Sequence, residues 1–417
     1  MLANNSLGDL LTTLFDRQPF GRKAEDGERI VEYCRALLSD KAETSGLQYA
    51  IRILNQYTML NRDQKEAFFA FLNDELDLDA AEISALAMSY TEDPSVKNFK
   101  TLSSAAEPRR QELFRQLNEA PGATAEIVKM RKDLLTMLKT HPELAKTDHD
   151  LVHLLRSWFN RGFLVMRQIN WDSPASILEK IIAYEAVHQI RTWDDLRLRL
   201  HPADRRCFAF FHPAMPDEPL IFVEVALTKG VPNSIQGVLS DNRETIDESA
   251  ADTAVFYSIS NCQDGLAQIS FGNSLIKQVA RDLSQELPNV KTFVTLSPIP
   301  GLIRWLEQNG ETVPVDDPEK LAKLAASYLI EAKTPDGRPL NAVARFHLGN
   351  GAIVHAIHPV ADLSENGLAQ SAGAMVNYHY DLSRISQNVL RYAMEKKVPA
   401  STAVRSLARQ AAKEQRV

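Results

Sequence analysis

The sequence predicts an α+β protein in which an N-terminal all-helical bundle precedes a mixed α/β domain. Apolar residues recur at helical spacing up to about residue 160, whereas later apolar runs are short, rich in β-branched and aromatic residues, and alternate with helical stretches. The 417 residues also exceed the roughly 250–300 at which one hydrophobic core usually stops growing. We therefore expect two domains, residues 1–160 and residues 161–417.

Four stretches of the first part place apolar residues along one side of a helix. They are Leu7, Leu10, Leu11 and Leu14; Ile30, Tyr33, Cys34, Leu37 and Leu38; Ala67, Phe68, Phe71 and Leu72, after a polar start at residues 61–63; and Ile127, Met130, Leu134 and Leu138. Stripes of this kind usually build a hydrophobic core. We therefore expect a helical bundle here and assign no ligand to it.

The pattern changes near Arg161–Gly162, where short apolar runs begin at residues 163–166. The predicted strands are Cys207–Phe211, Leu220–Leu227, Thr253–Ile259 and Thr292–Leu296, and the predicted helices are Ile177–Ile190, Ser274–Leu283 and Ser383–Lys396. Strands interleaved with helices indicate a sheet covered by helices rather than a sandwich of two sheets.

Composition and charge exclude several classes of function. A formal net charge of -7 argues against a nucleic-acid-binding surface, which normally carries clustered Lys and Arg. The three cysteines are too few for a disulfide framework or a cysteine-based zinc site, and they fit a reducing compartment. No apolar run reaches the ~18–20 residues of a membrane span, and the N-terminus lacks the pattern of a signal peptide. We expect a cytoplasmic protein with no nucleic-acid or membrane partner.

A glycine-containing segment precedes the predicted helix Ser274–Leu283. With Gly272 just before the helix, such a loop can point unpaired backbone N–H groups and the positive end of the helix dipole at a phosphate. A glycine before a helix is more often a simple turn, so the pattern alone leaves both interpretations open. An anionic ligand at this acidic protein would need local cations.

Several dense motifs then point to one family. The segments that carry the resemblance are Tyr184–His188, Arg205–Cys207, Val223–Thr228, Gly265–Ala267, Gly272–Lys277, Leu296–Gly301, Phe346–Ala352 and Asn377–Tyr380. In content and in order they resemble segments of the malonyl-CoA decarboxylases. The resemblance covers about residues 162–395, whereas the helical part is similar to the helical domain of that family in character and position alone.

The resemblance implies an enzyme that converts malonyl-CoA to acetyl-CoA and carbon dioxide, with a catalytic domain of acetyltransferase-like (GNAT-like) fold. It places Ser297 at the position of the proton acceptor, His347 at that of the proton donor, and Tyr380 near the substrate. The coenzyme A-binding residues that it implies are Ala267, Gln268, Ile269, Ser270, Phe271, Gly272 and Asn273. It also implies a homo-oligomer, a dimer or tetramer built partly through the helical domain.

Taken without the resemblance, the three catalytic candidates also fit structural roles. Ser297 precedes Pro298 and could satisfy a turn, although Pro298 and Pro300 restrict the backbone in a way that would fix its hydroxyl. His347 is one of ten histidines and could donate to a backbone carbonyl in a core. Tyr380 could be an aromatic core residue.

The chemistry implied by the resemblance needs no organic cofactor and no metal. Loss of carbon dioxide leaves an electron pair that the thioester carbonyl takes up as an enolate, so the substrate contains its own electron sink. His347, His355 and His358 are spaced by eight and three residues, which fits no familiar catalytic zinc pattern. We therefore expect that no cofactor and no metal take part.

Some points stay open at the level of the sequence. Arg345, two positions before His347, is a candidate for holding the malonyl carboxylate, but a solvated arginine is at least as plausible. Ser270 stands where animal relatives have an acidic residue, so any network through that carboxylate does not carry over. The alternative functions are a GNAT-type acyltransferase that moves an acyl group from coenzyme A to an amine, and a catalytically silent coenzyme A sensor or helical scaffold.

Overall fold

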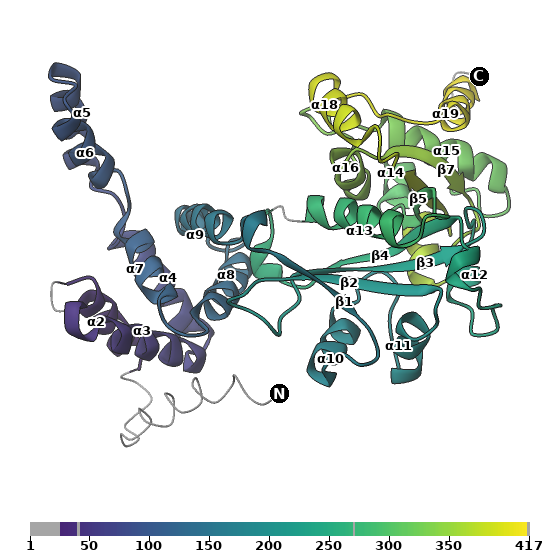
Figure 1. Cartoon of the computed structure of the whole chain (residues 1–417). Helices are drawn as coiled ribbons and strands as arrows, with labels where there is room; N and C mark the ends of the chain where they lie inside the picture. The colour runs from purple at the N-terminus through teal and green to yellow at the C-terminus, as the bar shows by residue number, and fades with distance from the viewer. Residues whose placement is uncertain (1–25, 40–41, 270–271, 415–417) are drawn as a thin grey trace. The chain divides into compact units, whose positions relative to one another are not determined.

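The computed structural model describes residues 26–39, 42–269 and 272–414 (Figure 1). Contacts divide the chain into two compact units. Of the described residues, the first comprises those up to Asn160 together with Gln263–Ile269, and the second comprises Arg161–Cys262 and those from Gly272 onward. A helical region is thus followed by a unit built on a mixed sheet, which confirms the predicted α+β class.

The first unit is helical over its described residues. Its helices are α2 (Asp26–Leu37), α3 (Ala42–Met59), α4 (Arg62–Asp74), α5 (Ala80–Glu92), α6 (Val96–Ala105), α7 (Arg109–Asn118), α8 (Ala123–Met137) and α9 (Ala145–Trp158), with 3-10 turns at Pro142–Leu144 and Asp264–Leu266. The predicted stripes lie on α2, α4 and α8, where Ile30, Phe68 and Ile127 are at most 1% exposed. The stripe predicted at residues 7–14 lies outside the described residues.

The predicted polar start of α4 forms a complete N-terminal cap. The Asn61 side chain accepts a hydrogen bond from the Gln64 N–H at 2.9 Å, and the Gln64 side chain accepts one from the Asn61 N–H at 3.0 Å. This reciprocal capping satisfies two backbone donors that a helix start otherwise leaves without partners. It explains why the helix begins at Arg62.

The segment Gln263–Ile269 packs on α8 inside the first unit. The fully buried Arg131 of α8 donates to the carbonyl oxygens of Gly265 at 2.7 Å and Ala267 at 2.9 Å, and it pairs with Asp148 at 2.8 Å. The approach is so close that a Cβ at Gly265 would lie 1.9 Å from the Val128 carbonyl oxygen. Only glycine fits this contact without a shift of the backbone.

The second unit is built on one mixed sheet. Its strands are β1 (Val165–Ile169), β2 (Arg205–Phe211), β3 (Ile221–Thr228), β4 (Thr253–Asn261), β5 (Thr292–Thr295), β6 (Ser297–Pro298), β7 (Ile353–His358) and β8 (Met375–His379). The order is β1-β2-β3-β4-β5-β8-β6, with β7 on β8. The β4–β5 pair is parallel and the other pairs are antiparallel, so the chain crosses over between β4 and β5 through helix α13.

Helices cover both faces of this sheet, with α10 and α11 on one face and α13 on the other (Figure 1). The helices of the unit are α10 (Ala175–Tyr184), α11 (Trp193–Leu200), α12 (Ile235–Leu239), α13 (Gly272–Glu286), α14 (Leu302–Gln308), α15 (Pro318–Glu331), α16 (Ala342–Gly349), α17 (Glu365–Ser371), α18 (Ile385–Glu395) and α19 (Thr402–Glu414), with 3-10 turns at Arg161–Phe163 and Glu248–Ala250. Among the described helices, none is long and apolar enough to cross a membrane.

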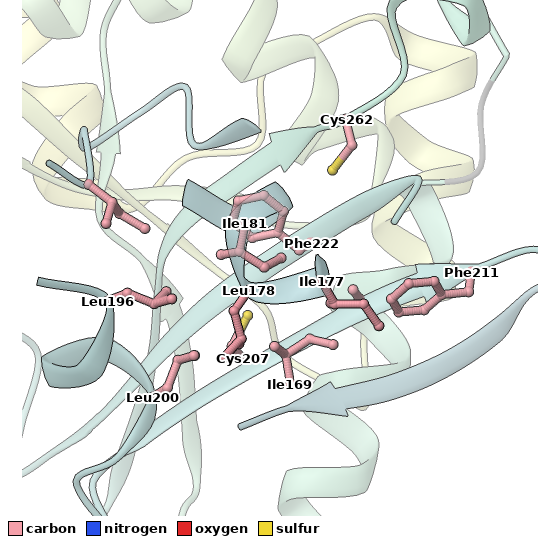
Figure 2. Packing of buried hydrophobic residues seen from close by; sticks show 12 residues of the cluster. Ile169, Ile177, Leu178, Ile181, Leu196, Leu200, Cys207, Phe211, Phe222 and Cys262 are labelled. Carbon is pink, nitrogen blue, oxygen red and sulfur yellow. The ribbon is translucent and has the colours of Figure 1, made fainter. Parts of the chain in front are cut away.

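Figure 2 shows the core between the sheet and α10 and α11. Ile177 and Ile181 of α10 and Leu196 of α11 are fully buried against Phe222 of β3 and Cys207 of β2. Burying such side chains contributes ~1.5–3 kcal/mol each. This packing fixes the two helices on the sheet and explains the apolar spacing that predicted α10.

The predicted helix Ile177–Ile190 is too long, because α10 ends at Tyr184. The next residue, Glu185, turns its carboxylate back onto the chain and accepts hydrogen bonds from the N–H groups of Val187 at 2.8 Å and His188 at 2.7 Å. A side chain that satisfies backbone donors in this way competes with the helical pattern. The following residues form a turn that leads into α11.

The four predicted strands correspond to β2, β3, β4 and β5, with ends that differ by three residues or fewer. The predicted helices near residues 274 and 383 correspond to α13 and α18, again with small shifts at the ends. Strands β7 and β8 were not predicted. They stand at the far end of the chain, and their pairing with β5 and β6 depends on contacts that no local pattern shows.

Candidate active site

Ser297 lies where the sheet continues past β5. It forms the short strand β6 with Pro298 and pairs with Val376 of β8, which fixes its backbone at the end of the sheet. Its exposed fraction is 6%. The β-branched run that ends at Thr295 therefore delivers a serine hydroxyl into the interior at a fixed position.

His347 comes from the last turn of α16 and is 2% exposed. The helix begins at its N-cap, Asn341, whose side chain accepts a hydrogen bond from Ala344 N–H at 2.8 Å. The Asn341 amide also donates to the Pro300 carbonyl oxygen at 2.9 Å. One residue thus starts the helix and ties it to the segment that follows Ser297, which brings histidine and serine to the same place.

A chain of hydrogen bonds joins the side chains. Ser297 Oγ donates to Thr295 Oγ1 at 2.8 Å and lies 3.3 Å from His347 Nε2, while His347 Nδ1 lies 2.8 Å from the Tyr380 hydroxyl. With the Ser297 proton directed at Thr295, Ser297 accepts from His347 Nε2–H, and Nδ1 accepts from the Tyr380 hydroxyl. In the other tautomer Ser297 donates to Nε2. Ser297 and His347 can therefore pass a proton in either direction.

Aromatic rings surround the imidazole. The Tyr378 ring stacks on it with centroids 4.4 Å apart, and Phe346 and Tyr380 meet it edge-on at 5.1 and 6.1 Å. Burial disfavours the charged ring and lowers the pKa of His347 to about 3, and burial raises the pKa of Tyr380 well above its usual range. At neutral pH His347 is therefore uncharged in the ligand-free site.

The structure brings together all three catalytic candidates of the sequence analysis, Ser297, His347 and Tyr380. Sequence reasoning missed two contributors, Thr295 and Tyr378. Thr295 is two residues before Ser297, so alternation along a strand could have placed both on one face. Tyr378 lies on β8, two residues before Tyr380, which directly follows the strand. The Tyr378 backbone N–H donates to Thr295 Oγ1 at 3.1 Å.

The predicted coenzyme A segment is described in part. Ala267–Ile269 follow the 3-10 turn of the first unit, and Gln268 has a left-handed φ of 68°. Ser270 and Phe271 lie outside the described residues, and Gly272 and Asn273 form the first positions of α13, two residues earlier than the predicted helix start.

Cations gather around α13. Burial and the positive charges of Arg161 and Arg281 lower the pKa of Lys277, which stands in the second turn of the helix. Because these positive charges repel one another, an anion that binds beside Lys277 stabilises its charged form. The negative net charge predicted a need for local cations but did not identify them, although Lys277 ends the motif Gly272–Lys277.

Arg345 is engaged elsewhere. Its guanidinium donates to the carbonyl oxygens of Pro339 at 2.7 Å and Leu340 at 2.8 Å. Residues two apart on a helix point to different sides, so Arg345 and His347 do not face the same region. The structure gives Arg345 a role in holding the entry to α16 and not in gripping a substrate beside His347.

No metal centre stands out in the part of the chain that the structure describes, where no group of three or more His, Cys, Asp or Glu side chains could hold an ion. Two of the histidines considered from the sequence have other neighbours. His358 Nε2 contacts the Asn377 side chain, and the His355 ring lies beside His379 with centroids 5.4 Å apart.

The fold and the site define an α+β protein with a buried, hydrogen-bonded serine, histidine and tyrosine in its mixed-sheet unit. Comparison with known proteins gives the family. The Malonyl-CoA decarboxylase C-terminal domain matches residues 162–317 and 315–417, and the Malonyl-CoA decarboxylase N-terminal domain matches residues 76–159. The chain belongs to the malonyl-CoA decarboxylase family.

Individual relatives agree with this assignment. The malonyl-CoA decarboxylase structure from Rhodopseudomonas palustris is 47% identical, with a TM-score of 0.85 over 91% of this chain and 99% of that one. The structure from Agrobacterium vitis is 46% identical, with a TM-score of 0.86 over the same shares. The mitochondrial malonyl-CoA decarboxylase of Anser anser anser is 36% identical over 354 residues, which are 73% of this chain and 70% of the relative.

The lowered pKa of His347 predicts a specific pH dependence of stability. Between the ordinary value of 6.5 and about 3, the unfolded chain binds a proton on this histidine that the folded chain does not, so stability falls as pH falls through this window. In His347→Asn this contribution is absent. We expect the free energy of unfolding of the parent, relative to the variant, to decrease by up to about 1.4 kcal/mol per pH unit below 6.5 in urea titrations. Parallel curves for the two proteins would contradict the neutral, buried histidine.

Proposed function

We propose that Ser297, His347 and Tyr380 carry out the decarboxylation of malonyl-CoA in this chain. The observation that carries the proposal is the continuous set of hydrogen bonds from Thr295 through Ser297 and His347 to Tyr380. A histidine that served packing alone would need one partner for its ring N–H. Here both ring nitrogens meet hydroxyl groups, as a residue that gives and takes protons requires.

The reaction breaks one carbon–carbon bond. The electron pair of the bond between C2 and the carboxylate carbon moves into the thioester, carbon dioxide leaves, and the remaining enolate takes a proton at C2 to give acetyl-CoA. A hydroxyl donor such as Ser297 stabilises the developing enolate oxygen, because its position is set before the reaction. His347 delivers the proton to C2.

The substrate itself makes His347 able to donate. In the ligand-free site burial holds the pKa of His347 at about 3, and a neutral imidazole is a poor acid. The malonyl carboxylate brings a negative charge into the same low-dielectric region, which favours the imidazolium and raises that pKa. The proton is thus taken up with the substrate, and once the carboxylate has left as neutral carbon dioxide the imidazolium becomes a stronger acid.

Coenzyme A would be held by the segment Ala267–Asn273 and by the cations of α13. The N-terminus of α13 offers backbone N–H groups and a positive dipole end to the pyrophosphate. Lys277, with Arg161 and Arg281 close enough to lower its pKa, adds local positive charge to a protein whose net charge is negative. These features support the predicted position of the phosphate groups.

A homo-oligomer that involves the helical unit also remains our proposal. Helices α5 and α6 contact each other, yet none of their residues is buried. Met88, Val96 and Phe99 are 63%, 71% and 55% exposed. A helical pair with this much exposed apolar surface is typical of a region that another chain covers, and light scattering of the purified protein tests for that assembly.

The substitution His347→Asn separates catalysis from structure. It removes the titrating group and keeps a polar side chain, so we expect kcat to fall ~10²–10⁴-fold with a much smaller change in the affinity for coenzyme A. His355→Asn is the matched control, because His355 lies on β7 beside His379, and its kcat should stay near that of the parent. Activity is measured per folded molecule alongside a melting curve. Near-normal turnover of folded His347→Asn would remove this residue from the mechanism.

The substitution Lys277→Met tests the phosphate site. Loss of one charge-assisted contact, worth ~1.5–3 kcal/mol, should raise KM for malonyl-CoA by about ten-fold or more while kcat changes little. The effect should shrink at high salt, because the interaction is electrostatic. Lys320→Met, in the exposed first turn of α15, is the control. An unchanged KM at low salt would place the phosphates elsewhere.

A further inference from the structure

The second unit contains a cavity of about 690 Å³ that the proposed mechanism does not use. Its wall comes from the turn after α10, from Arg199 of α11, from α12 and from the residues around the start of α17. A volume of this size accommodates a small organic ligand.

The cavity lies on the opposite face of the sheet from Ser297 and His347. Successive side chains of a strand point to opposite faces. On β8, Val376 pairs with Ser297, whereas Met375 packs with Ile235 of α12, and Ile235 also lines the cavity. A ligand in this cavity is therefore separated from the proton-transfer residues by the sheet itself.

Negative charge dominates the wall. Glu185, Asp362 and Glu365 line it, opposed by Arg191 and Arg199. Arg199 is paired with the buried Glu224 at 3.0 Å and also acts electrostatically on Glu185 and His188. Among the residues that line this cavity, three carboxylates thus face two guanidinium groups, which leaves an excess of negative charge. The wall favours a cation.

The position of Asp362 is built into the backbone around it. Its Oδ1 accepts a hydrogen bond from the Ser364 N–H at 3.0 Å. Its carboxyl carbon would lie 2.4 Å from a Cβ at Gly367, so a glycine is needed at that position of α17 for the carboxylate to stay in place. This buried carboxylate is held in one orientation at the cavity wall.

His188 adds an acceptor without a partner. The side chain lines the cavity and is 8% exposed, and its Nε2 has no hydrogen-bond partner. Burial lowers the pKa of His188 to about 4, so the ring is neutral at pH 7, and a hydrogen bond to the backbone of Tyr257 occupies its N–H. The remaining nitrogen can accept a hydrogen bond from a donor such as an ammonium group.

We propose that this cavity is a binding site for a small organic ammonium compound with a short apolar chain. The carboxylates of Asp362 and Glu365 and the free nitrogen of His188 suit the ammonium group, and Val187, Ile235 and Leu239 suit the chain. A metal ion is a poorer fit, since the described residues contain no group of three or more metal-ligating side chains. The site binds its ligand independently of malonyl-CoA.

Calorimetric titration of the full chain with n-butylammonium tests the proposal, with n-butanol and butyrate as neutral and anionic probes of similar size. We expect saturable binding of n-butylammonium alone. Asp362→Asn and the exposed Glu365→Gln should each weaken it at least ten-fold, while Glu331→Gln, outside the cavity, leaves it unchanged. Decarboxylation of malonyl-CoA should be unaffected in Glu365→Gln, because the sheet separates the two sites.

Several results would overturn this proposal. One is the absence of saturable n-butylammonium binding, and another is equal binding of n-butanol or butyrate. A third is undiminished binding of n-butylammonium by both Glu365→Gln and folded Asp362→Asn. Competition between n-butylammonium and malonyl-CoA would also overturn it, because the cavity would then belong to the substrate site. Each outcome is independent of whether His347 proves to be the proton donor.

Discussion

The removal of His347 from water determines what the mixed-sheet unit can do chemically. Stacking on Tyr378 and edge contacts with Phe346 and Tyr380 leave the imidazole neutral, with hydroxyl groups at both nitrogens. In the mechanism that we propose, this site gains its charge from the substrate, since the malonyl carboxylate favours the imidazolium. The same low dielectric would strengthen the hydrogen bond that we propose from Ser297 to the enolate.

The surrounding fold keeps this arrangement in place. Asn341 caps α16 and holds the Pro300 carbonyl, and the Tyr328 hydroxyl donates to the same oxygen at 3.1 Å. Ser297 is paired with β8, the strand that carries Tyr378 and directly precedes Tyr380. Three separate segments of the chain therefore meet at one buried point, and each is fixed by backbone as well as side-chain contacts. Such preorganisation is what proton transfer at a carbon atom requires.

Local patterns predicted much of the fold but little of the site. The stripe at Ile127 and the β-branched run that ends at Thr295 reflect burial of a helix face and of a strand, which depends on near neighbours in the sequence. Ser297 and His347 are fifty residues apart, so no periodicity could join them, and their pairing came from the family resemblance. The cytoplasmic location and the oligomeric state stay predictions, and the curated relative compared above is named as mitochondrial.

The elements that sequence reasoning missed depend on long-range contacts. Strand β8 lies between β5 and β6, although some eighty residues separate it from both. The segment Gln263–Ile269 groups with the helical unit through Arg131, whose two partners in that segment are more than 130 residues away. The end of α10 at Tyr184 reflects one side chain, Glu185, that captures backbone donors. Propensity and periodicity describe none of these interactions.

Mass spectrometry of the product formed in D₂O tests the central claim most directly. Purified protein is mixed with malonyl-CoA, without an acceptor amine, metal or cofactor. The acetyl-CoA is analysed before the C2 hydrogens of malonyl-CoA exchange with the solvent. A decarboxylase that protonates an enolate at C2 should release carbon dioxide and place one solvent deuterium in each acetyl group. Acyl transfer that needs an added amine, or acetyl-CoA formation that fails without a cofactor, would contradict the account.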